Sequence, residues 1–344
     1  MRIAMILKLL TCLSLPFMVN ADCKPSATKV GGSNGGLKKG QQICSGDLIF
    51  SDEFDNLNED LWNHEHQVDG AGNGEFQQYV NDRSVSYSKD GKLFILPKVI
   101  GDGPLHDGFF NPVQSARLTT AGRFNFKYGR MEARAKIPAG DWLWPAIWLM
   151  PQDSKYGNWP RSGEIDVLES RGNKNLVVSG KNIGTQLEAS TLHWGKSPGE
   201  NQFQKTHYEK SRGDGFDSDY HNYLVEWTPD YMAFKVDNEE FGRITIPDGG
   251  FYQFGQLSGD NPWAGGSKMA PFDQNFYLIV NVAVGGTSGY FPDNASNPGG
   301  KPWKNSSPNA ARDFWNGNGQ WRPTWNEQTT QRALKVEYIK VWAI

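Results

Sequence analysis

Residues 163–170 read Gly-Glu-Ile-Asp-Val-Leu-Glu-Ser, and acidic and apolar residues alternate along most of this stretch. Alternate residues of a β-strand share a face, so Glu164 and Asp166 are expected on one face and the apolar residues around them on the other. Strict alternation would turn Glu169 to the apolar side. One extra residue, a β-bulge near 167–168, returns Glu169 to the face of the other acids. The stretch predicts a half-buried strand with three carboxyl groups on its open face.

Three carboxyl groups on one strand face repel one another strongly. They cannot all be ionised at neutral pH, so at least one is expected to keep its proton. A protonated carboxyl group beside an ionised one is the pair that cleaves a glycosidic bond, one as acid/base and the other as nucleophile. The alternative is an exposed edge strand whose acids serve only solubility. Such an edge usually mixes acids with Lys or Thr, so the spacing favours the catalytic interpretation.

The rest of the chain also favours β-structure. Its 344 residues include 39 Gly and 19 Pro, and both residues disfavour helix interiors, which argues against a bundle or a doubly wound sheet. Short apolar or alternating segments recur between Gly, Pro, Asn and Asp clusters, a spacing that predicts an all-β sandwich or jelly roll. We expect strands at 48–51, 93–97, 117–119, 129–135, 146–150, 164–169, 222–228, 231–236, 276–284 and 334–341. A helical turn is expected at 308–314, and long loops at 187–219 and 291–329.

The charge balance excludes two classes of partner. The chain has 35 basic and 38 acidic residues, a net charge of −3. This balance offers no attraction for nucleic acid or for an anionic membrane surface, so we expect neither as a partner.

The N-terminal segment predicts secretion. Arg2 precedes a mostly apolar stretch, and small residues before Asp22 allow cleavage, so residues 1–21 are typical of a signal peptide. We expect the mature chain, 22–344, to be a single domain, because no linker divides it.

Cleavage also resolves the odd number of cysteines. Cys12 leaves with the signal peptide, and Cys23 and Cys44 remain. In an oxidising compartment we expect this pair to form a disulfide that ties down residues 22–46. The sequons at Asn294 and Asn305 are expected glycosylation sites if the source is a eukaryote.

Several motifs, in the same order along the chain, resemble glycoside hydrolase family 16, and specifically its β-1,3-glucanase (laminarinase) branch. Residues 163–170 match the E-x-D-x-x-E signature of that family. The segments 289–292 (GYFP) and 314–317 (FWNG) look most like the invertebrate members. The other matching stretches are 51–54 (SDEF), 73–79 (NGEFQQY), 115–120 (SARLTT), 144–151 (WPAIWLMP), 193–195 (HWG), 281–286 (NVAVGG) and 336–341 (VEYIKV).

The resemblance implies a jelly roll of two antiparallel sheets with a concave substrate cleft, and it implies roles for individual residues. Glu164 resembles the nucleophile, Asp166 an assisting carboxylate and Glu169 the general acid/base, while His193 lies where the family carries a histidine near the acid/base. Flat indole rings can stack on glucose, and polar side chains can bind its hydroxyl groups. The implied substrate-binding residues are Asn73, Arg117, Trp144, Trp148, Trp159, Trp194 and Asn281.

The family also implies a possible structural calcium ion on the convex side. Glu53, Gly91 and Glu337 are the matching candidates, although relatives more often carry Asp at the last position. Calcium prefers several oxygen ligands. No cofactor is expected to be required for catalysis.

The function implied by the resemblance is a secreted, monomeric, retaining endo-β-1,3-glucanase that hydrolyses laminarin-like glucans by double displacement. Two alternatives remain. One is a non-catalytic β-1,3-glucan recognition protein on the same fold, a class that usually lacks the catalytic glutamates. The other is a hydrolase of another β-glycan, such as mixed-linkage glucan.

Overall fold

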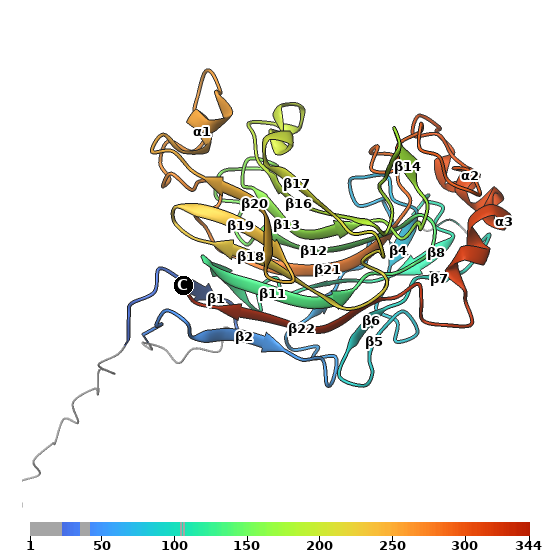
Figure 1. Ribbon diagram of the computed structural model, residues 1–344, viewed down its shortest axis with the longest axis horizontal. Helices are drawn as coiled ribbons and strands as arrows, with labels where there is room; N and C mark the ends of the chain where they lie inside the picture. Colours follow the sequence, from blue (N-terminus) through green and yellow to red (C-terminus); the bar gives the residue numbers. More distant parts are fainter. Residues whose placement is uncertain (1–22, 35–41, 104, 106) are drawn as a thin grey trace, which may run out of the picture.

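The computed structural model describes residues 23–34, 42–103, 105 and 107–344 (Figure 1). The predicted signal peptide, residues 1–21, lies outside the described residues, as does Cys12. The predicted disulfide between Cys23 and Cys44 is present, with Cα atoms 5.2 Å apart. Within the described residues, no helix has the length and apolar character needed to cross a membrane.

Two large antiparallel sheets stack on each other, which confirms the expected all-β sandwich (Figure 1). The first sheet carries the predicted carboxylate strand near its middle. Its strands, in spatial order, are β1 (Lys29–Gly31), β10 (Asn125–Lys127), β21 (Phe276–Val284), β12 (Leu143–Pro151), β13 (Glu164–Ser170), β16 (Leu187–His193) and β17 (His207–Ser211), with β9 (Arg117–Thr119) beside β21 and β3 (Asn63–His64) beside β9.

The second sheet covers the back of the first. Its strands, in order, are β20 (Glu239–Thr245), β19 (Tyr231–Val236), β18 (His221–Trp227), β11 (Gly129–Lys136), β22 (Leu334–Trp342), β6 (Leu93–Ile95) and β5 (Ser86–Ser88), with β2 (Leu48–Asp52) beside β22.

Smaller elements form the rims. Two small sheets contain β14 (Val177–Val178) with β15 (Lys181–Asn182), and β4 (Gln77–Tyr79), β8 (Val113–Ser115) and β7 (Lys98–Val99). The helices are α1 (Gly250–Gly255), α2 (Ala310–Asn316) and α3 (Asn318–Trp321), with 3₁₀ turns η1 (Pro198–Glu200), η2 (Phe203–Thr206) and η3 (Arg322–Trp325). The helical turn predicted at 308–314 corresponds to α2.

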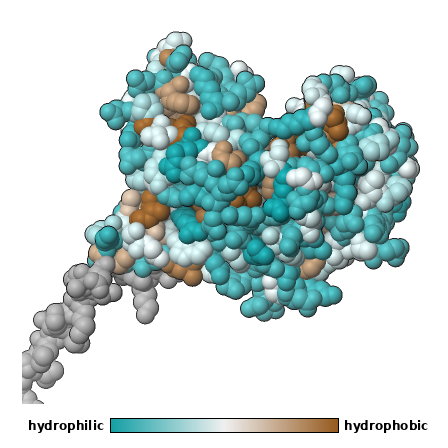
Figure 2. All heavy atoms as spheres, in the orientation of Figure 1, coloured by the Kyte–Doolittle hydropathy of each residue, from teal (hydrophilic) through white to brown (hydrophobic). Residues whose placement is uncertain are grey.

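The core lies between the two sheets because each strand alternates its side chains. On β12, Ile147 and Leu149 are fully buried, and they share the core with Val280 of β21 and Ile339 of β22. The alternate residues of β12 therefore face away from the second sheet. In Figure 2 the surface above this face is hollowed, between a lobe that carries α1 and a lobe that carries α2 and β14.

One loop prediction was wrong. The predicted loop 187–219 contains the strands β16 and β17. The sequence of β16 lacks the apolar alternation expected of a buried strand, because Glu188, Ser190 and Thr191 are polar and yet buried. The strand β20 was also not predicted; it lies at the edge of the second sheet, and four of its seven residues are exposed.

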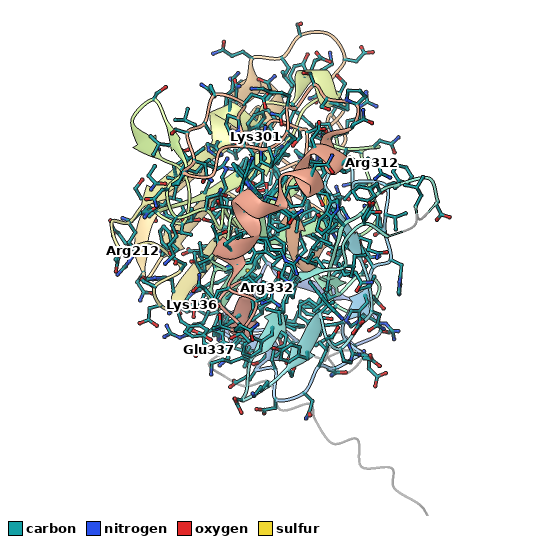
Figure 3. The ribbon with its side chains drawn as sticks, turned by 90° about the vertical axis from the view of Figure 1, so that its right-hand side faces the viewer. Lys136, Arg212, Lys301, Arg312, Arg332 and Glu337 are labelled. Carbon is teal, nitrogen blue, oxygen red and sulfur yellow. A yellow bond between two sulfur atoms is a disulfide. The ribbon has the colours of Figure 1, made fainter. Side chains whose placement is uncertain are left out.

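The two sequons differ in their surroundings. Asn294 is exposed, whereas Asn305 is half-buried. The side-chain amide of Asn305 donates to the carbonyl of Phe291 (3.1 Å), and Lys301, which Figure 3 labels, donates to its oxygen (2.6 Å). A glycan at Asn305 would disrupt these hydrogen bonds.

Glu188 is a buried acid with no obvious function. Its side chain points from β16 into the core, and neither carboxyl oxygen has a hydrogen-bond partner among the described residues. Burial raises the pKa of Glu188 well above 4.5, and Lys210 opposes this only in part. The protonated form is therefore the stable form inside the fold.

We predict that Glu188→Gln stabilises the protein at high pH. A raised pKa in the folded state gives stability that is complete below pH 4.5, the value for the unfolded chain, and is lost as the pH rises through the folded value. The amide cannot ionise. Between pH 4.5 and the pKa of Glu188 in the folded state, the unfolding free energy of the variant relative to wild type should therefore rise by about 1.4 kcal/mol per pH unit.

Urea unfolding at several pH values between 4 and 9 measures this difference. The exposed Glu59→Gln variant is the matched control, because Glu59 pairs with Arg83 and not with Lys210, and its unfolding free energy should keep the pH dependence of wild type. A constant difference for Glu188→Gln across the whole range would contradict the prediction.

Candidate active site

The predicted bulge in β13 is confirmed by the register of both neighbouring strands. Against β16, Asp166 faces Thr191 and Glu169 faces Ala189, so Val167 and Leu168 share one partner position. The register against β12 shifts at the same place. Val167 and Leu168 both lie in the core. The bulge thereby brings the three acids onto the open face of the sheet, as the sequence predicted.

A side chain from β16 satisfies the backbone at this bulge. An extra residue interrupts the hydrogen-bond ladder between two strands and leaves a backbone group without its partner. The hydroxyl of Ser190, which lies opposite the bulge, donates to the carbonyl of Val167 (2.8 Å). This bond explains why a polar residue occupies a buried position of β16.

Each of the three carboxyl groups has a different partner. The indole N–H of Trp159 donates to Oε2 of Glu164 (2.5 Å), and the indole N–H of Trp144 donates to Oε1 of Glu169 (2.9 Å). Oδ2 of Asp166 lies 3.3 Å from Nε2 of His193. All of these donors come from segments outside β13.

His193 is held from several sides. It faces Glu164 across the strand pair, and its ring packs against those of Trp159 and Phe203, at centroid distances of 5.6 and 5.3 Å. The side-chain nitrogen of Asn201 lies 2.8 Å from Nδ1, while its oxygen accepts from the backbone N–H of Phe203. The amide therefore donates to Nδ1. In this arrangement His193 is neutral, with its proton on Nε2 facing Asp166.

The acidic surroundings favour a second state of His193. Burial lowers its pKa, but the close approach of Asp166 and the charges of Glu164, Asp166 and Glu169 raise it more, to about 9. Protonation places a hydrogen on Nδ1, so the amide of Asn201 must then turn its oxygen toward the ring.

The buried acids favour their protonated forms. Burial raises the pKa of Asp166 well above 3.8, and the charges of Glu164 and Glu169 raise it further. Burial also raises the pKa of Glu169, while His193 and the indole of Trp144 oppose the rise. The cluster therefore retains a proton on a carboxyl group that faces the hollow, which is the property that a general acid needs.

The sheet register lines up polar residues beside Glu169. Arg117 of β9 faces Asn281 of β21, Asn281 faces Ala146 of β12, and Ala146 faces Glu169. On the other side of Glu169 lies Ala189. The small side chains of the two alanines leave room beside the carboxyl group.

Glu75 is the centre of a hydrogen-bond network at the Arg117 end of this row. It accepts from the side chains of Asn73 (3.1 Å), Gln77 (2.6 Å) and Tyr79 (3.1 Å). The guanidinium of Arg117 lies 4.6 Å from the ring centroid of Tyr79. Sequence reasoning missed Gln77 and Tyr79; their alternation with Glu75 was the signal that could have found them.

Asn281 continues this network to a tryptophan. It donates to the hydroxyl of Tyr79 (3.1 Å) and accepts from the indole of Trp148 (2.6 Å). The structure therefore brings the predicted residues Asn73, Arg117, Trp148 and Asn281 into one region.

The remaining predicted tryptophans occupy different environments. Trp159 has 39% of its surface exposed and can offer a ring face to a sugar. Trp144 is almost buried, and one face of its ring is covered by Tyr290.

The prediction for Trp194 was wrong. Its side chain is completely buried, its N–H donates to the hydroxyl of Thr206 (3.0 Å), and its ring packs against Phe251. The physical reason is the alternation of a strand: His193 faces the hollow, so the next residue points into the core.

Two of the three calcium candidates, Glu53 and Glu337, are engaged by cationic side chains. Glu337 forms ion pairs with Arg134 (2.6 Å) and Lys92 (3.6 Å), and Glu53 pairs with Lys340 (2.8 Å). These carboxylates are thus neutralised by cationic side chains, whereas a calcium site needs several free oxygen ligands. Among the described residues, the group of acids and histidine that does converge consists of Glu164, Asp166 and His193 of the cluster above.

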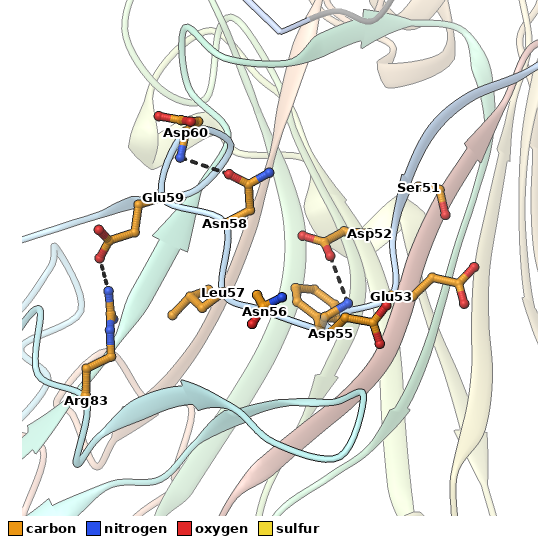
Figure 4. A pocket seen from close by; sticks show the side chains of 11 residues that line it. Ser51, Asp52, Glu53, Asp55, Asn56, Leu57, Asn58, Glu59, Asp60 and Arg83 are labelled. Atoms are coloured by element: carbon orange, nitrogen blue, oxygen red, sulfur yellow. Dashed lines mark hydrogen bonds and ion pairs between the residues drawn. The ribbon is translucent and has the colours of Figure 1, made fainter.

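A second concavity lies apart from the carboxylate strand. A pocket of about 830 Å³ is lined by residues 51–60 and Arg83, and Figure 4 shows these side chains. Its acids are partly engaged, because Asp52 accepts from the indole of Trp62 (2.7 Å) and Arg83 pairs with Glu59. None of its lining residues belongs to β12, β13 or β16.

Comparisons with known proteins agree with this geometry. Residues 72–257 match the family described as "Glycosyl hydrolases family 16". The chain is 44% identical to the "Beta-1,3-glucan-binding protein" of Penaeus monodon, over 86% of this chain and 90% of that protein. It is 34% identical to the "Glucan endo-1,3-beta-glucosidase" of Cryptopygus antarcticus, over 86% and 91%. The laminarinase from Rhodothermus marinus superposes with a TM-score of 0.60 at 26% identity, over 87% of this chain and 98% of that chain.

We predict that Asp166→Asn lowers the pKa of His193. Asparagine cannot ionise, so the variant loses the interaction and the charge by which Asp166 raises the pKa of His193, while the burial that lowers this pKa remains. An opposite charge at this distance is worth about 1–3 pH units. Nitrogen-15 NMR of the histidine side chains should show a midpoint near 9 in wild type and a clearly lower midpoint in the variant.

Asp237→Asn is the matched control, because Asp237 pairs with a different histidine, His221 (2.7 Å). It should leave the titration of His193 unchanged. If His193 has the same midpoint in wild type and in Asp166→Asn, the electrostatic account of the cluster is wrong.

Proposed function

Because the chain belongs to glycosyl hydrolase family 16, we propose that it is a retaining endo-β-1,3-glucanase that acts on laminarin-like glucans. The observation that carries the proposal is the bulged strand β13, which presents Glu164 and Glu169 on one face with a separate indole donor on each. A relative of similar length carries the name of this activity.

The proposed reaction uses the two glutamates in turn. Glu169 gives its proton to the glycosidic oxygen, and the carboxylate of Glu164 attacks the anomeric carbon, so the leaving sugar departs as an alcohol and a glycosyl ester forms on Glu164. Glu169, now ionised, takes a proton from water, and the resulting hydroxide displaces Glu164. Two inversions return the β configuration. The cycle ends with Glu169 protonated and Glu164 ionised.

The neighbouring groups support these roles. Burial raises the pKa of Glu169 above 4.5, which favours the protonated form that a general acid needs. Trp159 donates to Glu164 and so stabilises a carboxylate at that position. Asp166 lies between the two glutamates in the strand, with its Oδ2 3.3 Å from Nε2 of His193. No step of this cycle needs a metal ion or an organic cofactor.

The second candidate function is binding of β-1,3-glucan without hydrolysis. It is favoured by the name of the Penaeus relative, which is 44% identical to this chain. The same exposed indole and polar row would then hold the polysaccharide without cleaving it. A hydrolase of mixed-linkage glucan is a further alternative within the same chemistry.

We also propose that the protein is exported as a single catalytic domain, residues 22–344, and acts as a monomer. The Cys23–Cys44 disulfide supports an oxidising compartment. Of the two sequons, the exposed Asn294 is the proposed glycosylation site.

Hydrolysis of laminarin separates the two candidate functions. Purified mature protein should release reducing ends and short oligosaccharides from laminarin, and Glu164→Ala should release none. Lichenan and agarose in parallel define the substrate. If wild type binds laminarin in a pull-down but releases no more reducing ends than Glu164→Ala, the binding function replaces the enzymatic one.

Glu169→Ala should separate the acid/base from the nucleophile. General acid/base groups contribute about 10²–10⁴-fold, so kcat/KM on laminarin should fall by that factor. An aryl β-laminaribioside with a good leaving group needs no acid to leave. On this substrate the kcat/KM of Glu169→Ala should stay within about tenfold of wild type. In Glu169→Ala, azide can attack the glycosyl ester on Glu164 without a general base. Added azide should therefore restore turnover of the aryl glycoside and give a β-glycosyl azide.

Glu164→Ala serves as the comparison for this experiment, because it should lose activity on both substrates and should not give a β-glycosyl azide. Equal losses on laminarin and on the aryl glycoside in Glu169→Ala would mean that the two roles are assigned wrongly.

A further inference from the structure

Three side chains stack behind Glu169. The ring of Tyr290 lies parallel to the indole of Trp144, with a centroid distance of 3.8 Å and an angle of 5°. The guanidinium of Arg171 lies 3.9 Å from the centroid of the same tyrosine ring. Two planar groups at these distances cannot occupy one face, so Tyr290 is sandwiched between Trp144 and Arg171. Stacked aromatic pairs of this kind add stability beyond the area that they bury.

Hydrogen bonds attach Tyr290 to the chain that directly follows Glu169. Its hydroxyl donates to the carbonyl of Ser170 (3.1 Å), and its own carbonyl accepts from Nε of Arg171 (3.0 Å). Nη1 of Arg171 donates to the carbonyl of Ile183 (3.2 Å). Both ends of Tyr290 are therefore fixed relative to the end of β13.

The loop that carries Tyr290 is held as well. The backbone N–H groups of Thr287 and Ser288 both donate to the carbonyl of Asn73 (2.9 and 3.1 Å). Gly289 then turns the chain with φ +95°, a conformation that residues with a side chain rarely adopt. These contacts bring a residue from beyond the end of β21 over the indole of β12.

The hydrogen bond from Trp144 has a directional consequence for Glu169. An indole N–H can only donate, so Oε1 of Glu169 is its acceptor. When Glu169 is protonated, the proton is therefore directed to Oε2. The indole N–H and the nearby charge of Arg171 also favour the ionised carboxyl group, and both oppose the burial that raises its pKa.

We propose that Tyr290 is a positioning residue for Glu169: by stacking on Trp144 it holds the indole N–H on Oε1 and so fixes which carboxyl oxygen carries the proton. The inference rests on the acid/base role of Glu169 proposed above. Tyr290 acts through Trp144 and does not need to touch the substrate.

NMR of the indole groups tests the proposal without turnover. In protein labelled with nitrogen-15 at its 13 tryptophans, Trp144→Phe identifies the Trp144 indole signal. In wild type this signal should titrate with Glu169, and Glu169→Gln should abolish the titration. In Tyr290→Ala the titration should shrink by more than half, and any remaining midpoint should move to higher pH. Tyr290→Phe keeps the ring and should resemble wild type.

Two further variants make the result decisive. Tyr290→Leu keeps apolar bulk without a flat ring, and it replaces Tyr290→Ala if that variant does not fold. Tyr87→Ala removes a ring from another parallel stack, with Phe94 (5.1 Å, 5°), in the second sheet, and it should leave the Trp144 signal unchanged. An unaltered Trp144 titration in a folded Tyr290→Ala or Tyr290→Leu protein would overturn the proposal.

Kinetics add a readout that a purely structural role would not move. On laminarin, Tyr290→Ala should lose about tenfold or more in kcat with KM within about twofold, and the alkaline limb of kcat against pH should move upward. An aryl glycoside with a good leaving group should be less affected in kcat/KM. If wild type does not hydrolyse laminarin, the proposed enzymatic function fails, while the indole titration still decides the role of Tyr290.

Discussion

The crowding of three carboxyl groups on one face of β13 is the constraint to which the surrounding structure responds. Their charges repel, and the sheet buries them against its neighbours, so each needs a separate source of compensation. Trp159 donates to Glu164, His193 lies against Asp166, and Trp144 donates to Glu169. These donors differ in kind: an indole N–H favours a carboxylate through one hydrogen bond, whereas a histidine can also supply a full charge. The cluster can therefore hold its three acids in different protonation states.

The bulge and its supports follow from the same constraint. A regular strand has a period of two and cannot place residues 164, 166 and 169 on one face. The bulge solves this problem but leaves the carbonyl of Val167 without a ladder partner, and Ser190 supplies the missing donor. The polar character of β16 thus has a local cause. It is the cost of presenting Glu169 to the hollow, and it also concealed β16 from sequence-based prediction.

Some features of the fold and the site can be predicted from the sequence and others cannot, for reasons that differ from residue to residue. The carboxylate strand, its bulge and the disulfide were predictable because each depends on spacing along the chain or on a count of cysteines. Trp194 was misplaced because nearness in sequence to His193 was taken as nearness in space, although adjacent strand residues face opposite sides. Tyr290 and Asn201 could not be found in this way. Their partners, Trp144 and His193, meet them only through loops whose paths depend on the whole fold.

The energetics of the cluster bear on the choice between binding and hydrolysis. A surface that only binds a neutral polysaccharide gains nothing from carboxyl groups whose pKa values are raised by burial, because a buried acid destabilises the fold at neutral pH. Amides at positions 166 and 169 would offer hydrogen bonds to hydroxyl groups without that cost. The chain instead keeps both acids, and it places an indole donor on Glu169 and a stacked tyrosine behind that indole. Perturbed acids with dedicated supports are typical of sites that move protons, and they support the enzymatic proposal over binding alone.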